Sequence, residues 1–336
     1  MKNGMRLRQI WILSIATMLL ATMGIGAMTR LTGSGLSIVE WKPISGILPP
    51  FNEVQWNQEF QNYQQYPDFK SRPSLTLKEF KVLFWWEFVH RLVARSLLLV
   101  ILIPYGLLFV LGKIEKQHHR KVFGLLIFGG IQGFLGWYMV KSGLVQVPRV
   151  SHFRLMIHFI WACLILGYLA QWLGEESQSG NLPRHSRSFV RGLSWLCLAQ
   201  MALGALVAGS RAGYIYNTFP KLGDAWFPVR FFSYPDLWEN FFYNQINLQF
   251  FHRLGGWILL GTSLYAFWKK IYSIFALMMA QFFLGVLTLV LMIPPPVATL
   301  HQLLGAILFF YLRYLASTLK NDGFIKTNTG IPNNDK

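Results

Sequence analysis

The sequence predicts an all-α polytopic membrane protein with eight transmembrane helices, arranged as two repeated four-helix bundles. Three observations lead to this fold class. Of the 336 residues, 53% are apolar and only 13% are charged, whereas about 25% are charged in an average soluble domain. Eight apolar runs are each long enough to cross a hydrocarbon layer about 30 Å thick. Several polar positions also recur at matching places in the two halves of the chain.

The eight spans are expected near residues 10–28, 84–112, 121–141, 151–173, 189–209, 249–268, 272–293 and 298–318. The first follows a basic segment, as the core of a signal peptide would. Its apolar run is longer than the roughly 7 to 15 residues of such a core, so we interpret it as a retained helix. The expected units are an N-terminal bundle (1–178), a C-terminal bundle (179–320) and a cytoplasmic tail (321–336).

The basic residues predict the orientation in the membrane. Fourteen of them fall at one side of the eight-helix arrangement: Lys2, Arg6, Arg8, Lys113, Lys116, Arg120, Lys121, Arg184, Arg187, Arg191, Lys269, Lys270, Lys320 and Lys326. The long connections on the other side, residues 30–83 and 210–247, are nearly neutral. By the positive-inside rule both termini are cytoplasmic. We expect a bacterial inner membrane rather than an organelle import route, because no long Arg/Ser-rich transit segment is present. The net charge of +17 therefore reflects topology, and we expect no nucleic-acid partner.

The two halves share a series of matching residues. Thr29-Arg30 matches Ser210-Arg211 at an offset of 181, and His90 matches His252 at 162. Further along, the segment 132–136 matches 281–285 at 149, and His158 matches His301 at 143. The offset shrinks only between helices. The chain therefore looks like two copies of one four-helix unit, related by an axis along the membrane normal.

One stretch combines ionisable groups at the head of a span. Glu87 and His90 are three residues apart and share one face of a helix, and Arg91 follows directly. Ionisable groups are costly in lipid, so such a cluster is a candidate functional site. A helix end at the headgroup level, with Glu87 and Arg91 solvated, is the alternative. The second half repeats the stretch with Gln249 in the place of Glu87, so one half keeps the histidine and loses the acid.

Four histidines lie at matching positions on the second and fourth helix of each half: His90, His158, His252 and His301. Two imidazoles per bundle, without a nearby cysteine or carboxylate trio, suit a bis-histidine haem iron better than tetrahedral zinc. Hydrogen-bonded packing histidines are the alternative. His152 competes with His158 as a ligand but has no counterpart in the second half. His118, His119 and His185 are expected to be solvated, and the two cysteines, Cys163 and Cys197, to be packing residues without a disulfide.

These residues together resemble the haem A synthase family, known as CtaA in bacteria. The resemblance is carried by Glu87-Phe88-Val89-His90-Arg91 with Arg95, by the segment T-R-L-T-G-S-G-L-S at 29–37, and by the repeated histidine pair. It covers all eight helices, roughly residues 10 to 318. Many Gram-positive members carry a cysteine pair in an outer loop, which this chain lacks. It therefore looks closer to the proteobacterial and mitochondrial branch.

The resemblance implies an activity and roles for individual residues. Members of the family oxidise the C8 methyl group of haem O to a formyl group, which gives the haem A of terminal oxidases. Carried over by position, His90 and His158 match the substrate-haem site, and Glu87 matches its essential acid. His252 and His301 match the ligands of a bound haem b. Glu87 could stabilise developing positive charge or accept a proton, which Gln249 cannot do at neutral pH.

Arginines at the outer helix ends are candidates to pair with haem propionates. We assign Arg91 and Arg95 to the substrate site and Arg253 to the haem b site; Arg30 and Arg211 lie at similar places. Snorkelling to the interface is the alternative. The counterpart of Arg95 is Trp257, so Arg95 is expected to serve the first half only.

Two other functional classes fit parts of the pattern. A two-haem membrane electron carrier of the quinone or ferric reductase kind would share the histidine pairs but needs no Glu87. A transporter built from parallel repeats would share the symmetry, but transporter sites usually lie near the midplane. Besides haem O and the lipid bilayer, the partners to consider are haem O synthase, an electron acceptor and a second copy of the chain.

Overall fold

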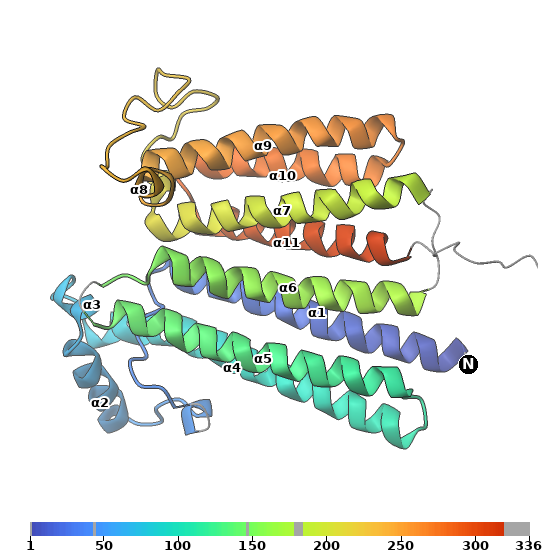
Figure 1. Cartoon of the computed structure of the whole chain (residues 1–336). Helices are drawn as coiled ribbons and strands as arrows, with labels where there is room; N and C mark the ends of the chain where they lie inside the picture. Colours follow the sequence, from blue (N-terminus) through green and yellow to red (C-terminus); the bar gives the residue numbers. More distant parts are fainter. Residues whose placement is uncertain (1, 43–44, 146–147, 178–183, 319–336) are drawn as a thin grey trace, which may run out of the picture.

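The computed structural model describes residues 2–42, 45–145, 148–177 and 184–318, and it is dominated by eight long helices (Figure 1). These are α1 (Lys2–Leu31), α4 (Leu77–Val110), α5 (Lys116–Gly143), α6 (His152–Ser177), α7 (Arg184–Ser210), α9 (Gln245–Trp268), α10 (Tyr272–Val290) and α11 (Pro295–Thr318). All eight expected spans fall on them, and the helices extend beyond most of the apolar runs. The expected tail, 321–336, and the division at 178/179 lie outside the described residues.

Seven of the long helices are apolar enough, over a sufficient length, to cross a membrane. The chain is therefore an all-helical, multi-pass membrane protein, as the composition predicts. The eighth long helix, α9, has 24 residues but is not among these seven. Its first half carries the polar residues Gln245, Asn247, Gln249, His252 and Arg253.

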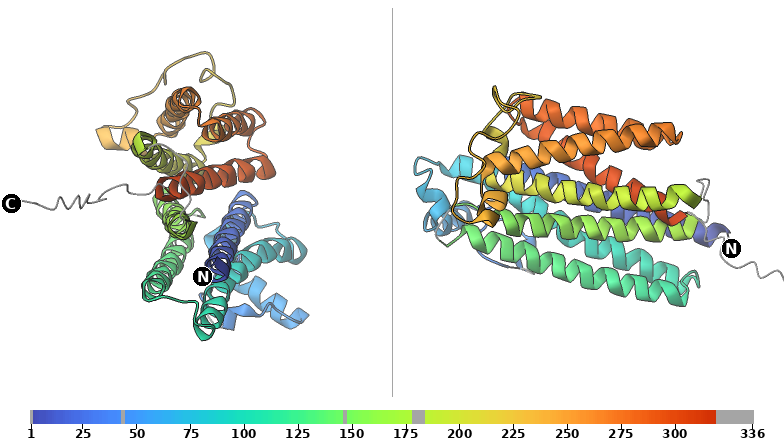
Figure 2. Two further views of the ribbon diagram at one scale, coloured as in Figure 1. Left: turned by 90° about the vertical axis from the view of Figure 1, so that its right-hand side faces the viewer. Right: turned by 45° about the horizontal axis from the view of Figure 1, so that its top comes forward.

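The long helices form two groups that pack side by side (Figures 1 and 2). One group contains α1, α4, α5 and α6, and the other contains α7, α9, α10 and α11. Helices α1 and α6 form the face of the first group that contacts the second. Here α6 packs against both α7 and α11, and α1 packs against α11. We call this contact between the groups the seam. The edge helices α4 and α5, and α9 and α10, lie on opposite sides of this seam (Figure 2).

Small residues bring α6 and α11 close together at the seam. A Cβ atom on Gly174 would lie 1.9 Å from Oγ of Ser317, and one on Gly167 would lie 2.9 Å from the ring of Phe309. Close backbone approach of this kind is typical of helix pairs in membranes, where packing replaces the hydrophobic effect. Cys163 and Cys197 are free and buried in the apolar cores of the two groups, as expected for packing residues.

The long connections lie at one end of the bundle (Figure 1). The first contains η1 (Ser45–Ile47), α2 (Glu53–Gln64) and α3 (Pro67–Lys70), and the second contains η2 (Ala212–Tyr214) and α8 (Leu237–Phe242). A capping box of Thr76 and Glu79 fixes the start of α4. Trp56, Tyr63 and three phenylalanines of α4 form a separate aromatic core that holds the first connection on α4: Phe80, Phe84 and Phe88. We call the end of the bundle that carries the two long connections the outer end.

Candidate functional site

The histidines of the first half each lie against a glycine of a neighbouring helix. A Cβ atom on Gly26 of α1 would lie 2.7 Å from Cε1 of His90 on α4. One on Gly136 of α5 would lie 3.0 Å from Cε1 of His158 on α6. The nearest ring atoms are Cε1 and the two nitrogens, so the nitrogen-bearing edge of each imidazole occupies the space that glycine leaves. The two rings are near enough to interact electrostatically.

The second half repeats this arrangement. A Cβ atom on Gly204 of α7 would lie 3.0 Å from Cε1 of His252 on α9, and one on Gly285 of α10 would lie 2.8 Å from Cε1 of His301 on α11. His252 and His301 also lie within electrostatic range of each other. The structure thus brings the four histidines together as two pairs, one in each helix group. Across the described ranges, no three His, Cys, Asp or Glu side chains gather in a way that could hold a metal ion.

Each histidine has a polar neighbour on the helix that supplies its glycine. Nδ1 of His90 lies 3.1 Å from the carbonyl oxygen of Thr22. The amide nitrogen of Gln132 lies 3.3 and 3.4 Å from the two ring nitrogens of His158, and that of Gln200 lies 3.1 Å from Nδ1 of His252. Beside His301, the amide of Gln281 donates to the backbone carbonyl of the histidine at 3.0 Å.

The carboxylate of Glu87 is buried, with 2% of the residue exposed, and it is surrounded by donors. Its Oε2 atom accepts hydrogen bonds from the backbone nitrogen and hydroxyl of Ser37, both at 2.7 Å, and from the nitrogen of Ile38 at 2.9 Å. Its Oε1 atom accepts one from Arg91 at 2.5 Å. Glu87 therefore holds the segment after α1 against α4, one helical turn from His90. The alternative of a solvated Glu87 is wrong.

Gln249 has the corresponding place in the second half and makes the opposite kind of contact. Its amide nitrogen donates to the carbonyls of Gly213 and Tyr216, at 3.3 and 3.0 Å. Its oxygen is buried without a hydrogen-bond partner. Both residues hold the outer connection on their helix, but the first half uses an acceptor with a negative charge and the second half a neutral donor.

Arginines one or two helical turns after Glu87 and Gln249 make further hydrogen bonds to the same outer connections. Arg91 donates to the carbonyl of Ile38 at 2.9 Å, and Arg95 donates to that of Lys42 at 3.1 Å. Arg253 donates to three carbonyls of the second connection, those of residues 216, 218 and 221. These guanidinium groups are turned toward the outer connections rather than free at the surface. The counterpart of Arg95, Trp257, stacks on Phe219 with ring centroids 5.5 Å apart.

His118, expected in a solvated loop, is fully buried near the other end of the bundle. Its Nδ1 accepts a hydrogen bond from the backbone nitrogen of Glu115, so Nε2 carries the hydrogen and donates to Glu176 at 2.7 Å. Arg8 of α1 donates to the other oxygen of Glu176 at 2.9 Å. The expectation failed because the helix α5 begins at Lys116, two residues before this histidine. The cluster joins α1, α5 and α6.

Two other histidines also contact protein groups. His119 is half-buried, and its Nδ1 lies 2.6 Å from the hydroxyl of Tyr105. His152, at the start of α6, donates from Nε2 to the carbonyl of Phe242 in α8 at 3.1 Å. It faces the second connection and not the pair formed by His90 and His158. The side chain of His185 lies outside the described part of the chain.

The glycine contacts reveal a repeat that the sequence comparison missed. In each case the polar neighbour stands four residues before the glycine: Thr22 and Gly26, Gln132 and Gly136, Gln200 and Gly204, Gln281 and Gly285. Gly26 and Gly204 are 178 residues apart, whereas Thr29-Arg30 and Ser210-Arg211 are 181 residues apart. The two pairs therefore do not align at one common offset. The spacing of glutamine and glycine was visible in 132–136 and 281–285, but in α1 the glutamine is replaced by threonine.

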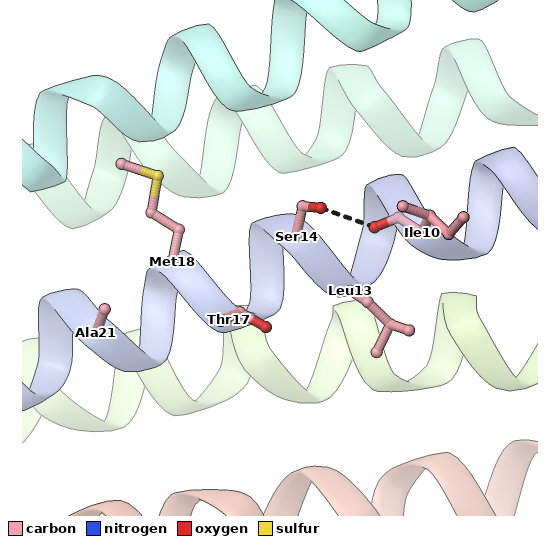
Figure 3. A pocket seen from close by; sticks show the side chains of 6 residues that line it. All are labelled: Ile10, Leu13, Ser14, Thr17, Met18 and Ala21. Atoms are coloured by element: carbon pink, nitrogen blue, oxygen red, sulfur yellow. Dashed lines mark hydrogen bonds between the residues drawn. The ribbon is translucent and has the colours of Figure 1, made fainter.

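A hollow of about 460 Å³ lies elsewhere, along an outward-facing stripe of α1 (Figure 3). It is lined by Ile10, Leu13, Ser14, Thr17, Met18 and Ala21. The hydroxyl of Ser14 donates to the carbonyl of Ile10 at 2.9 Å. None of the six lining residues has an ionisable side chain. The chemistry is concentrated at the histidine pairs instead.

Comparison with known proteins identifies the family of the chain. The family model COX15-CtaA, described as cytochrome oxidase assembly protein, matches residues 9–312. A heme A synthase of Agrobacterium fabrum is 39% identical over 319 residues, which cover 90% of this chain and 87% of the relative. Heme A synthases of Allorhizobium ampelinum and Chelativorans sp. are 37% and 39% identical, over 88% and 89% of this chain and 86% and 87% of their own. The chain belongs to the COX15-CtaA family of cytochrome oxidase assembly proteins.

Proposed function

We propose that this protein is a haem A synthase, which oxidises the C8 methyl group of haem O to a formyl group and so supplies haem A to terminal oxidases. The observation that carries the proposal is the pair of histidines in each helix group, each with its ring against a glycine of a neighbouring helix. We call these four glycines the glycine seats. The relatives of the chain are named heme A synthase. Family membership supplies the reaction, and the histidine pairs supply places for two haem groups.

The residues fit haem groups at both pairs. Each pair offers two imidazoles from facing helices, as a six-coordinate haem iron requires. The glycines let each imidazole approach the neighbouring helix, in space that a Cβ atom would otherwise fill. Nδ1 of His301 and Nε of Arg253 are buried without hydrogen-bond partners. We infer that His90 and His158 bind the substrate haem O, and that His252 and His301 bind a resident haem b.

The division of labour follows from the difference between Glu87 and Gln249. Conversion of a methyl to a formyl group takes up the oxygen of one water and releases four protons and four electrons, so positive charge develops beside the substrate site. Glu87 is placed to offset that charge, because its carboxylate lies one turn from His90. Four donors occupy its oxygens, which favours this electrostatic role over proton acceptance. A haem held by His252 and His301 would supply a redox-active iron that carries electrons away.

The arginines are proposed to serve the haem sites from the outer end. Arg91 and Arg95 lie on α4 one and two turns from Glu87, and their guanidinium groups hold the outer segment that covers this end of the first group. Arg253 holds the corresponding segment of the second group and retains a buried Nε without a partner. Its remaining donor is a candidate partner for a propionate of haem b.

We infer that the two helix groups are repeats of one four-helix unit and that α9 is the eighth span. Its 24 residues suffice to cross the membrane, and its polar residues face the histidine site and the outer connection. Arg8, Lys113 and Lys121 lie at the end opposite the long connections. This distribution supports a bacterial inner membrane with both termini in the cytoplasm. Haem O synthase, an electron acceptor and a second copy of the chain are proposed as partners.

Extraction and chromatography of the haems in the purified protein would test the proposed function. Haem B together with haem O or haem A is the expected result. The two-haem electron carrier would share both histidine pairs, so haem B alone, from cells that contain haem O, would contradict the synthase.

A further inference from the structure

The two helix groups differ in how closely their edge helices pack. In each group the first long helix packs on the second and on the fourth, and the third packs on the fourth. In the second group the edge helices α9 and α10 also pack on each other. Over the described residues, their counterparts α4 and α5 do not pack in this way. They meet at the end away from the histidine pair, where the hydroxyl of Tyr105 lies 2.6 Å from Nδ1 of His119.

Large side chains occupy the space between α9 and α10. The ring of Phe282 on α10 lies 5.1 Å from that of Trp257 on α9, measured between centroids. Further from the outer end, the hydroxyl of Ser263 on α9 donates to the sulfur of Met279 on α10 at 3.9 Å. Met278 of α10 is buried, with 4% of the residue exposed. The second group is therefore closed between its edge helices.

Glycine takes the place of these three α10 residues in the first group. At the offset of 149 that aligns 132–136 with 281–285, the equivalent positions on α5 are Gly129, Gly130 and Gly133. All three are exposed, and a Cβ atom on any of them would meet nothing within 4 Å. The side chains that close the second group thus have no equivalent on α5.

The corresponding side of α4 is also uncovered. Arg95 stands in the place of Trp257, but it donates to the carbonyl of Lys42 in the outer connection at 3.1 Å. Leu98, one turn further along α4, is 50% exposed, whereas its counterpart Leu260 is half-buried. We call the space between Leu98 and the three glycines of α5 the α4–α5 gap.

The α4–α5 gap adjoins the proposed substrate site. Gly129, Gly133 and Gly136 are spaced by four and three residues, so they share one face of α5. Gly136 is the glycine seat of His158. The gap therefore begins beside a histidine of the first pair and runs along α5 away from the outer end, within the apolar part of the span.

The haems assigned to the two groups differ in a corresponding way. Haem O carries a long farnesyl-derived chain, where haem b has a short vinyl group. Such a chain is costly to expose to water and is stable in contact with apolar surface. We propose that the α4–α5 gap binds the isoprenoid chain of haem O and makes the first group specific for a haem with a long apolar substituent. This inference rests on the proposed function, because it requires the substrate to bind at His90 and His158.

The test gives the first group the side chains of the second. The double variant carries Gly130→Met and Gly133→Phe. Each methylene group that loses its apolar contact weakens binding by roughly fourfold, so displacement of the chain should lower the affinity for haem O at least about tenfold. The affinity for haem B should not change, because the second group is proposed to hold haem b with the same side chains in place. The measurement is a spectroscopic titration of detergent-solubilised protein, from cells without haem O, with each haem.

Gly106→Phe is the matched control. A Cβ atom on Gly106 of α4 also meets nothing within 4 Å, but this residue lies about four turns after His90 and outside the gap. Both affinities should equal those of the wild type. Gly133→Ala should not close the gap either, because a single methyl group at this position meets nothing.

Three results would overturn the chain subsite. Equal affinities of the wild type for haem O and haem B would leave the gap to membrane lipid. An unchanged affinity of the double variant for haem O would show that the chain lies elsewhere, and loss of affinity for both haems would show that the substitutions block the whole site. The low-spin spectrum of the resident haem verifies folding, and if the double variant loses it, Gly130→Met alone decides by the same comparison. A wild-type chain that forms no haem A from haem O contradicts the proposed function itself.

Discussion

Oε2 of Glu87 lies 2.7 Å from the backbone nitrogen of Ser37, a residue 50 positions earlier in the chain. This contact fastens the segment that follows α1 to the helix that carries His90. A charged acceptor in a buried place typically contributes about 1.5 to 3 kcal/mol to such hydrogen bonds. The residue that distinguishes the two halves chemically is therefore also a structural anchor, and its two contributions can be measured separately.

The contribution of Glu87 to holding the segment after α1 can be measured by hydrogen exchange. In Glu87→Gln the amide has one acceptor oxygen in place of two, and its NH₂ group faces the donor of Arg91. The backbone amides of Ser37 and Ile38 should therefore exchange at least about tenfold faster, since 1.4 kcal/mol corresponds to a factor of ten. The amide of Ser34, which donates to the carbonyl of Thr29 at 2.8 Å, is the internal control. Unchanged exchange at 37 and 38 would show that the carboxylate does not hold this segment.

Substitution of the glycine seats tests the histidine site. Gly136→Ala places a Cβ atom 3.0 Å from the ring of His158, whereas Gly133→Ala on the same helix meets nothing within 4 Å. Overpacking of this kind costs about 1 to 3 kcal/mol, so haem binding in the first half should weaken by roughly 5- to 150-fold. Gly133→Ala should leave binding unchanged. The measurement is haem titration of detergent-solubilised protein, and equal affinities in the two variants would contradict the site.

The ligands of the resident haem can be tested by truncation. His252→Ala or His301→Ala leaves the iron one axial ligand short, so the content of tightly bound haem b should fall and the low-spin spectrum should be lost. His152→Ala is the matched control, because its imidazole donates to the carbonyl of Phe242, away from both pairs. An unchanged low-spin spectrum in both ligand variants would mean that other residues hold this haem.

The buried cluster at the opposite end predicts a stability effect without a spectral one. Glu176 receives hydrogen bonds from Arg8 and His118 and is 7% exposed. Loss of one partner of a buried pair costs about 3 to 5 kcal/mol, so Glu176→Gln should lower the melting temperature. Glu175 pairs with Lys121 at the surface, and Glu175→Gln should cost at most about 1 kcal/mol. Melting curves in one detergent compare the two; equal melting temperatures would exclude a role for the cluster in holding α1, α5 and α6 together.

Much of the fold was predictable because its signals are local. Apolar length gave the positions of all eight long helices, and the histidines stood out because such residues are rare in apolar runs. The boundaries were less accurate. Lys116 to Arg120 form the first turns of α5 rather than a loop, so His118 was misplaced and the Glu176 cluster was missed.

The parts of the site that could not be predicted depend on contacts between distant segments. Nothing near Glu87 in the sequence indicates that Ser37 and Ile38 occupy its oxygens, because that contact depends on the path of the chain after α1. The glycine seats pair residues on different helices, such as Gly26 and His90. The four-residue spacing from a glutamine was visible in 132–136 and 281–285, but its extension to Thr22 and Gly26 depends on the contact between Gly26 and His90.

The formation of haem A in cells tests the central claim most directly. The chain is expressed in a bacterium that makes haem O but no haem A, and the extracted haems are separated by chromatography. The wild-type chain should produce haem A. Glu87→Gln should reduce haem A per protein by roughly 10² to 10⁴, as for loss of a group that stabilises charge at a buried site. If haem O stays unconverted while the wild-type chain carries two low-spin haems, the protein is an electron carrier and the account is contradicted.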